Sequence, residues 1–466
     1  MGATLYSSDW NASGQIPLRS VKDGSLDKFG SLNDTDGGTT QRNHFYANYI
    51  AATDDQEVEI NLYKIDYTYN LYSDFTFYSA DPINGDQIEQ TDTRNVLGGQ
   101  AKWRKNLSTD NLSHYFTLGA SWRQDSIDNA LYRTTSQERI GTTSENGIRQ
   151  NNNAFFLEDE VKWSSWFTTI VGLRSDYFNF VVDDKIEDQN PDGIKTSGQN
   201  SASMLQPKAN LIFTTSPNSN IFANYGRGFH SNDARGTVNS ENPVSPLTKA
   251  DSYELGLRQY LFDKKLTYSL AAYLIDLDKE RVWVGDAAES EEKARSQRRG
   301  LEFETRYAAT KWMVLDLDVN YNRSRLLGVP ASENAVPLAP SFISSAGVTI
   351  NNLDGYYGRL GAFHLADRYA SEDRYFKAQG FTRLDLTAGK KWSAWDVSIR
   401  IQNLLNTKIR EAQFVNTSRK DSETTPAACT GGSRPDNSNG FVGCEDIHFT
   451  PAFPIFVTGK VTYNFD

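Results

Sequence analysis

Apolar and polar residues alternate with a period of two through long tracts of this 466-residue chain. The pattern is clear near the C-terminus, where apolar side chains face one way and polar ones the other: Phe453, Ile455, Val457, Val461, Tyr463 and Phe465 against Thr458, Lys460, Thr462 and Asn464. Such alternation indicates β-strands, because successive side chains of a strand point to opposite faces. A lysine on the polar face does not suit a dry core. The pattern therefore predicts strands with one face toward lipid and the other toward a wet interior.

The connections between these tracts alternate in length. Short turns are predicted near 54–55, 108–111, 164–167, 216–220, 262–265, 309–312, 353–356 and 393–395. Long polar connections are predicted near 11–39, 79–92, 123–151, 183–202, 230–251, 279–297, 324–340, 368–379 and 408–450. This alternation predicts an all-β fold class: a transmembrane antiparallel up-and-down β-barrel of about 18 strands, with short turns facing the periplasm and long loops facing outside.

Composition excludes several other classes of protein. Hydrophobic residues make up 38% of the chain, and no stretch approaches the ~18 apolar residues that a membrane-spanning helix needs. Aromatic residues make up 12%, which suits a barrel with aromatic girdles. The formal charge of −11 argues against binding nucleic acid, because phosphate recognition requires clustered Lys and Arg.

The tract 57–78 changes phase along its length. Val58, Ile60 and Leu62 occupy even positions, whereas Ile65, Tyr67, Tyr69 and Leu71 occupy odd positions. A β-bulge near Lys64 is predicted to absorb this shift. The tract is longer than the ~9–11 residues of a membrane-crossing strand, so its outer end is expected to project above the bilayer.

Six short motifs occur in a defined order: VGLRSDYF at 171–178, PKANLIF at 207–213, SYELGLR at 252–258, RRGLEFE at 298–304, VPLAP at 336–340 and QNLLNT at 402–407. Their order and spacing resemble the C-terminal β-barrel of TonB-dependent outer-membrane receptors, over essentially the whole chain. Intact members of that family have a plug domain inside a 22-stranded barrel. The resemblance therefore identifies 1–466 as one truncated receptor barrel that lacks a plug domain and about four strands.

The resemblance implies a receptor for energy-coupled uptake of a scarce nutrient, with a ferric siderophore or another metal chelate as the small-molecule ligand. It also implies an integral β-barrel in the cell outer membrane, in contact with outer-membrane lipid, and a TonB complex reached only through the missing plug domain. Two alternatives stay open: a passive porin-like channel, and a non-functional C-terminal fragment of a receptor.

Neither a catalytic nor a metal site is predicted. The motifs HExxH and GxSxG are absent, so the chain is not expected to be an enzyme, and no cofactor is predicted. The five histidines are scattered singly, without the short spacing of a metal site: His44, His114, His230, His364 and His448.

Two segments supply candidate ligand contacts. Residues 10–42 resemble an outer loop of some family members, in which Arg19, Lys22, Lys28 and Arg42 are candidates to meet an anionic ligand, with solvated loop charge as the alternative. The sequence GRGFHSNDAR, at 226–235, places three more candidates at the outer rim: Arg227, Phe229 and His230. Girdle aromatics and ordinary rim polar residues are the alternative there.

Several residues are assigned structural roles. Cys429 and Cys444 lie in one Gly/Pro/Asn-rich stretch, which favours a loop-closing disulfide in an oxidising compartment over free thiols or a metal site. Gly256 is expected to leave room for a neighbour, and Gly300 to relieve crowding or curvature in its strand. In QNLLNT, the two asparagines, at 403 and 406, suit the end of a strand.

Overall fold

The computed structural model describes residues 1–466 except 110–111, 190–193, 285–288, 439 and 466. Its main body is one antiparallel sheet of 18 strands, as the sequence predicts. The strands are β1 (Gly2–Asn11), β3 (Gly37–Ala52), β4 (Gln56–Ser73), β5 (Ile88–Ser108), β6 (Ser113–Thr135), β7 (Glu138–Lys162), β8 (Phe167–Asp184), β9 (Gly198–Ser216), β10 (Ser219–Ser231), β11 (Leu247–Leu261), β12 (Leu266–Leu277), β15 (Ser296–Ala308), β16 (Met313–Leu326), β17 (Phe342–Leu353), β18 (Tyr356–Leu365), β21 (Phe381–Trp392), β22 (Trp395–Gln402) and β26 (Phe456–Tyr463).

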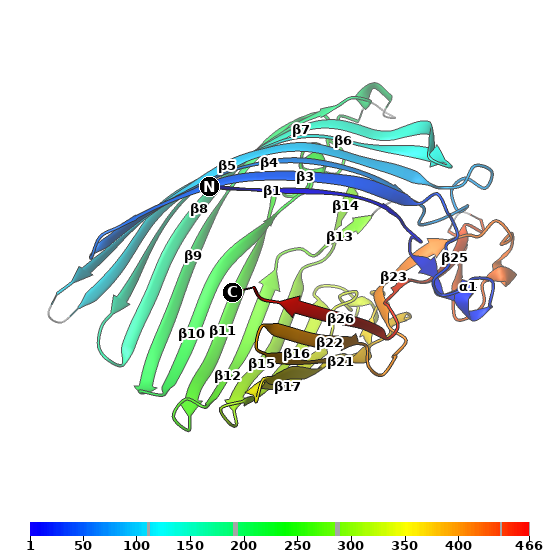
Figure 1. The fold of residues 1–466 in the computed structure, drawn as a ribbon. Helices are drawn as coiled ribbons and strands as arrows, with labels where there is room; N and C mark the ends of the chain where they lie inside the picture. The colour runs from blue at the N-terminus through cyan, green and yellow to red at the C-terminus, as the bar shows by residue number, and fades with distance from the viewer. Residues whose placement is uncertain (110–111, 190–193, 285–288, 439, 466) are drawn as a thin grey trace.

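Each strand of this sheet pairs with the strands before and after it, from β1–β3 to β22–β26, so the topology is up-and-down. Figure 1 shows the sheet curling into the wall of a barrel, with β1 and β26 apart from each other. No backbone pairing joins these two strands in the part of the chain that the structure describes. They are therefore the two edges of the sheet.

Short turns close one end of the sheet and long connections the other, at nearly all the predicted positions. The prediction of a long loop over 123–151 is wrong. Strands β6 and β7 continue through this region and are joined by the two residues Ser136 and Gln137. The end of this hairpin extends past the last paired residues of β8, and both of its faces carry polar residues.

Strand β4 also corrects a prediction. It pairs with β3 and with β5 in unbroken register through Lys64, so no β-bulge lies there. The change of phase instead reflects a change of face. Leu62 is exposed on the outer, apolar face, whereas Tyr67 and Tyr69 lie on the inner face nearer the long loops, where they line a cavity.

Glycines lie directly opposite aromatic residues at several places in the sheet. Phe222 pairs with Gly256, and a Cβ atom built on this glycine would lie 2.2 Å from the phenyl ring. A Cβ atom on Gly300 would lie 2.5 Å from the Tyr273 hydroxyl. The predicted roles of both glycines are therefore confirmed: each lets an aromatic ring cover the neighbouring strand. Four further pairs in which a Cβ atom on the glycine would meet the ring are Gly2–Tyr46, Tyr63–Gly98, Gly119–Phe156 and Tyr357–Gly389.

Exposed apolar side chains cover one face of the sheet, including Leu173, Leu255, Leu270, Leu301 and Leu317. Exposed tryptophans gather near the short turns: Trp163, Trp166, Trp392 and Trp395. Three exposed tyrosines lie nearer the long connections, Tyr177, Tyr253 and Tyr321, while others lie near the short turns. This arrangement matches an apolar band between two aromatic girdles. Among the described helices, none is long and apolar enough to span a bilayer.

Smaller elements lie in the long connections: β2 (Ile16–Pro17), α1 (Leu18–Lys22), η1 (Glu187–Gln189), α2 (Ala234–Val238), β13 (Arg281–Val284), β14 (Glu289–Glu292), η3 (Ala331–Glu333), β19 (Arg368–Tyr369), β20 (Lys377–Ala378), β23 (Arg410–Ser418), η4 (Pro426–Ala428), β24 (Arg434–Asp436) and β25 (Gly443–Pro451).

Three of these connections, 12–36, 366–380 and 403–455, pack together into what we call the loop head. Figure 1 shows its elements α1, β23 and β25 together at one end of the sheet. Strand β25 pairs with β2, β23 and β24. The loop head has its own apolar core, formed by Ile16, Leu18, Ala370, Phe376, Ala378, Ile447 and Phe449.

Candidate ligand-binding site

A cavity of about 430 Å³ lies on the inner face of the sheet, toward the end with the long connections. Four strands, β4 to β7, form its wall, and the short helix α2 contributes from the connection between β10 and β11. In the strand register, Tyr67, Arg94, Ile127 and Ile148 follow one another across the wall and share one face. The cavity is therefore built by side chains that point away from the apolar band.

Tyrosine and arginine side chains dominate the chemistry of this cavity. The rings of Tyr67 and Tyr69 are nearly parallel, with centroids 6.3 Å apart. The Arg94 guanidinium lies 5.9 Å from the Tyr67 ring centroid, and its Nε donates to Asp92 Oδ1 at 2.7 Å. The two phenol rings provide an aromatic surface, and the Arg94 guanidinium, which Asp92 holds in place, provides hydrogen-bond donors for an oxygen-rich ligand.

Helix α2 closes one side of the cavity. Asp233 caps this helix by accepting a hydrogen bond from the Arg235 amide at 3.0 Å, and its carboxylate also pairs with the Arg235 guanidinium at 2.6 Å. Ala234 packs into an apolar cluster with Ile148, Phe178, Phe180, Val182 and Leu247. This cluster packs α2 against β7 and β8. Arg235, the second arginine of the cavity, is therefore part of a helix that is held in place.

Two buried polar atoms in the cavity wall have no hydrogen-bond partner: Asn129 Oδ1 and Ser144 Oγ. Buried polar groups normally find a partner, so these atoms are available to a bound ligand or to water. Within the described ranges, no group of three or more His, Cys, Asp or Glu side chains is arranged to hold a metal ion.

Two of the other candidates, Arg42 and Phe229, lie near residues that form this cavity. Arg42 is exposed on β3, directly opposite Tyr67 in the register. Phe229 packs against the Phe178 ring, with centroids 5.4 Å apart, at the border of the cluster that holds α2. Arg227 pairs with Asp251 at 2.9 Å, and His230 is exposed at the end of β10. None of the four lines the cavity itself.

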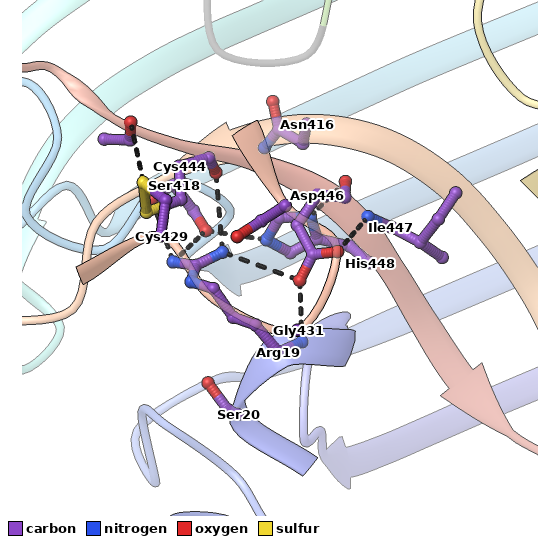
Figure 2. Close-up of polar contacts among 12 residues, drawn as sticks. Arg19, Ser20, Asn416, Ser418, Cys429, Gly431, Cys444, Asp446, Ile447 and His448 are labelled. Atoms are coloured by element: carbon purple, nitrogen blue, oxygen red, sulfur yellow. Dashed lines mark hydrogen bonds and ion pairs between the residues drawn. A yellow bond between two sulfur atoms is a disulfide. The ribbon is translucent and has the colours of Figure 1, made fainter. Parts of the chain in front are cut away.

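Arg19, by contrast, lies in the interior of the loop head and has no exposed surface. Its guanidinium donates to both oxygens of Glu423 at 2.8 Å and to the Ser418 carbonyl at 2.9 Å. Its amide donates to Asp446 Oδ2 at 2.7 Å, and Figure 2 shows Arg19 reaching from α1 toward β25. The assignment of Arg19 as a ligand contact is therefore wrong, because its donors are already used inside the protein.

The surroundings of Arg19 set the charges in the loop head. Burial opposes ionisation of Glu423, but the hydrogen bonds from Arg19 and from the Lys420 amide outweigh it and lower the pKa of this carboxyl. Burial raises the pKa of Asp446 and, together with the Arg19 charge, lowers the pKa of His448 to about 3. His448 is therefore neutral, and its Nε2 lies 2.8 Å from Ser418 Oγ.

The remaining residues of the 10–42 segment also serve the loop head. Cys429 and Cys444 form a disulfide, with an S–S distance of 1.99 Å, next to Arg19 (Figure 2). Lys22 is exposed and donates to the Gly431 carbonyl. The Lys28 ammonium lies 4.5 Å from the Phe29 ring centroid. Both lysines are thus occupied with loop contacts rather than directed at the cavity.

Similarity to known proteins identifies the type of barrel. The family model described as TonB dependent receptor-like, beta-barrel matches residues 2–404. The chain belongs to this family. As a TonB-dependent receptor barrel it is an integral protein of the outer membrane, and the family comprises receptors and transporters rather than enzymes. No curated protein matches the sequence.

Solved structures share the fold of this receptor barrel. The ferric citrate transporter FecA in its unliganded form has a TM-score of 0.74 at 13% identity, covering 98% of this chain and 66% of that one. The ferric yersiniabactin uptake receptor FyuA from Yersinia pestis has a TM-score of 0.74 at 11% identity, covering 100% and 67%. The siderophore receptor PiuA from Acinetobacter baumannii has a TM-score of 0.75 at 13% identity, covering 99% and 71%. The chain thus spans about two thirds of the length of these proteins.

Proposed function

We propose that this barrel captures a metal chelate, such as a ferric siderophore, for energy-coupled uptake across the outer membrane. The inner-face cavity is the observation that carries the proposal, because Tyr67, Tyr69 and Arg94 present rings and a guanidinium below the long connections. Aromatic rings pack against the organic shell of a chelate, and guanidinium groups donate to its oxygens. The similar structures, a ferric citrate transporter among them, support the same ligand class.

In this proposal the barrel supplies the ligand-binding wall, and TonB would act through a plug domain. The loop head would hold the outer connections in place, and Arg42, Phe229 and His230 would frame the cavity. A passive channel is the competing function. It predicts ion conductance that does not depend on the chelate, whereas a receptor predicts saturable binding.

The test measures chelate binding by the purified protein. Tryptophan fluorescence monitors the binding, with ferric citrate and with a ferric catecholate as ligands. We expect the double variant Tyr67→Ala/Tyr69→Ala to weaken binding by about tenfold or more, since each aromatic contact contributes roughly 1 kcal/mol. The matched control Tyr253→Ala/Tyr321→Ala removes two tyrosines from the outer face and should bind as the unaltered protein does. Equal affinity of both double variants, or chelate-independent conductance without binding, would contradict the proposal.

A further inference from the structure

Three arginines share one face at the outer ends of β15 and β16. Arg299 lies directly opposite Arg323 in the register, and Arg325 is two residues further along β16. Alternate residues of a strand point to the same side, so these three side chains lie together. We call them the outer arginine patch.

This face of the sheet is the apolar one. The next pair toward the membrane centre is Leu301 and Tyr321, whose side chains are 51% and 53% exposed. The opposite face carries polar contacts, such as the hydrogen bond from Asn320 to Glu302. Arg323 follows Tyr321 by two residues, roughly 7 Å along the strand. The patch therefore lies at the outer border of the apolar band, at the level of lipid headgroups.

The charges of the patch are not balanced by the protein. Directly opposite residues of antiparallel strands have Cβ atoms roughly 5 Å apart, and like charges there destabilise the pair. Arg299 and Arg323 are both exposed, and neither has an ion-pair or hydrogen-bond partner among the described residues. The Arg325 Nε is buried without a partner, although its Nη2 donates to Gln297 at 3.2 Å.

The carboxylate of Asp276, on the neighbouring strand, does not neutralise the patch. Asp276 lies opposite Gln297 on β12, where it accepts a hydrogen bond from Gln297 at 3.1 Å. It also pairs with Arg295 at 3.4 Å, a fourth arginine just before β15. The three arginines of the patch therefore leave an excess of positive charge on a lipid-facing surface.

We propose that the outer arginine patch binds the phosphate group of a lipid in the outer leaflet. A guanidinium pairs with two phosphate oxygens at once, so one phosphate between Arg299 and Arg323 would relieve their repulsion. The acyl chains of the same lipid would lie along Leu301 and Tyr321 and along Leu274, which is opposite Arg299 on β12. A free phosphate ion lacks this second, apolar contact. The inference concerns the outer surface and does not depend on the ligand of the cavity.

The test is lipid retention by the purified full chain in detergent, measured by native mass spectrometry. Phosphatidic acid is compared with phosphatidylcholine of the same acyl chains. The variant Arg299→Gln/Arg323→Gln removes two positive charges but keeps side-chain length. Its matched control, Lys265→Gln/Lys311→Gln, makes the same charge change at the exposed short-turn end of β12 and β16. Heat-modifiable migration on gels verifies that each variant is folded.

We expect the unaltered protein and the lysine control to retain phosphatidic acid preferentially. The arginine variant should lose this preference by about 30-fold, because each charge near anionic lipid contributes about fivefold. If the double variant does not fold, Arg323→Gln alone should lower the preference about fivefold. Unchanged retention in the arginine variants overturns the proposal. Complete displacement of the lipid by millimolar inorganic phosphate also overturns it, because the patch would then be a site for free anions.

Discussion

Arg19 donates two hydrogen bonds of 2.8 Å to the carboxylate of Glu423, which lies 404 residues later in the chain. Arg19 belongs to the connection that follows β1, and Glu423 to the connection that precedes β26. Since β1 and β26 are the two edges of the sheet, this ion pair links the edges at their outer ends. Both side chains are buried, so water does not screen the pair.

Replacing Arg19 should destabilise the loop head. In Arg19→Met, the carboxylates of Glu423 and Asp446 stay buried without the guanidinium that they share, which costs about 3–5 kcal/mol. The rate of limited proteolysis within 403–455 should rise, while the 18-stranded sheet keeps its heat-modifiable migration. Lys28→Met, in the same segment, should change stability by less than about 0.5 kcal/mol. Equal protease sensitivity of the two variants would refute the role of Arg19.

The disulfide should stabilise the same region independently of the ion pair. Cys429 and Cys444 are 15 residues apart, and closing a loop of this size is worth about 3 kcal/mol. The variant Cys429→Ser/Cys444→Ser should therefore be cut faster by protease than the oxidised protein and as fast as the reduced protein. Thiol labelling without reductant should fail on the unaltered chain. Ready labelling of both cysteines would rule the bridge out.

The strands that cross the membrane could be predicted from sequence, because lipid on one side and water on the other impose a period of two. The β6–β7 hairpin could not. Its outer part, which includes Arg123, Asp125 and Arg149, carries polar residues on both faces. Alternation disappears in such a segment, so the sequence resembles a long loop although the backbone is extended.

The candidate site was harder to predict than the fold. Arg19 looks like a free loop cation in sequence, since its partners lie more than 400 residues away. The two tyrosines of the cavity are marked in the sequence by the change of phase in β4. A β-bulge explains such a shift as readily as a change of the face that carries the apolar residues. Arg94 and Asn129 gave no local signal, because the cavity exists only where four strands and α2 meet.

The pairing of Phe222 with Gly256 should be visible as an energetic coupling. A Cβ atom on residue 256 would lie 2.2 Å from the phenyl ring, so Gly256→Ala should cost about 1–3 kcal/mol through overpacking. In the background Phe222→Ala the same change should cost less, with a coupling energy above about 0.5 kcal/mol. Heat-modifiable migration against temperature gives the four stabilities of the cycle.

Gly226→Ala is the matched control for this cycle. Gly226 lies on β10, the strand of Phe222, and a Cβ atom built there would meet nothing within 4 Å. The control should therefore leave the unfolding temperature nearly unchanged. Additive effects of the changes at 222 and 256 would show that the glycine is not required by the ring.

Two buried carboxyl groups should make the base of the 74–87 connection sensitive to pH. Asp36 and Asp74 are 2% and 6% exposed, and Asp36 Oδ2 accepts a hydrogen bond from the Asp74 amide at 3.1 Å. Burial raises the pKa of Asp36 from its ordinary 3.8 to about 6. Burial, with the charge of Asp36 adding to it, raises the pKa of Asp74 to about 7. Neither carboxyl has a cationic partner among the described residues.

The folded state therefore holds more protons than the unfolded state between about pH 4 and 7. Because of this difference, the stability that these two groups contribute is fully present at low pH and is lost as the pH rises through 6 to 7. Amide hydrogen exchange in 74–87 should report a slope of at most about 1.4 kcal/mol per pH unit for each group. Asp74→Asn should flatten that slope, whereas Asp34→Asn, at an exposed position nearby, should leave it intact. A protection profile that does not change between pH 5 and pH 8, once corrected for intrinsic exchange, would mean that both carboxyls are already ionised at the lower pH. Their burial would then have to be offset by a cation or by water bound between them.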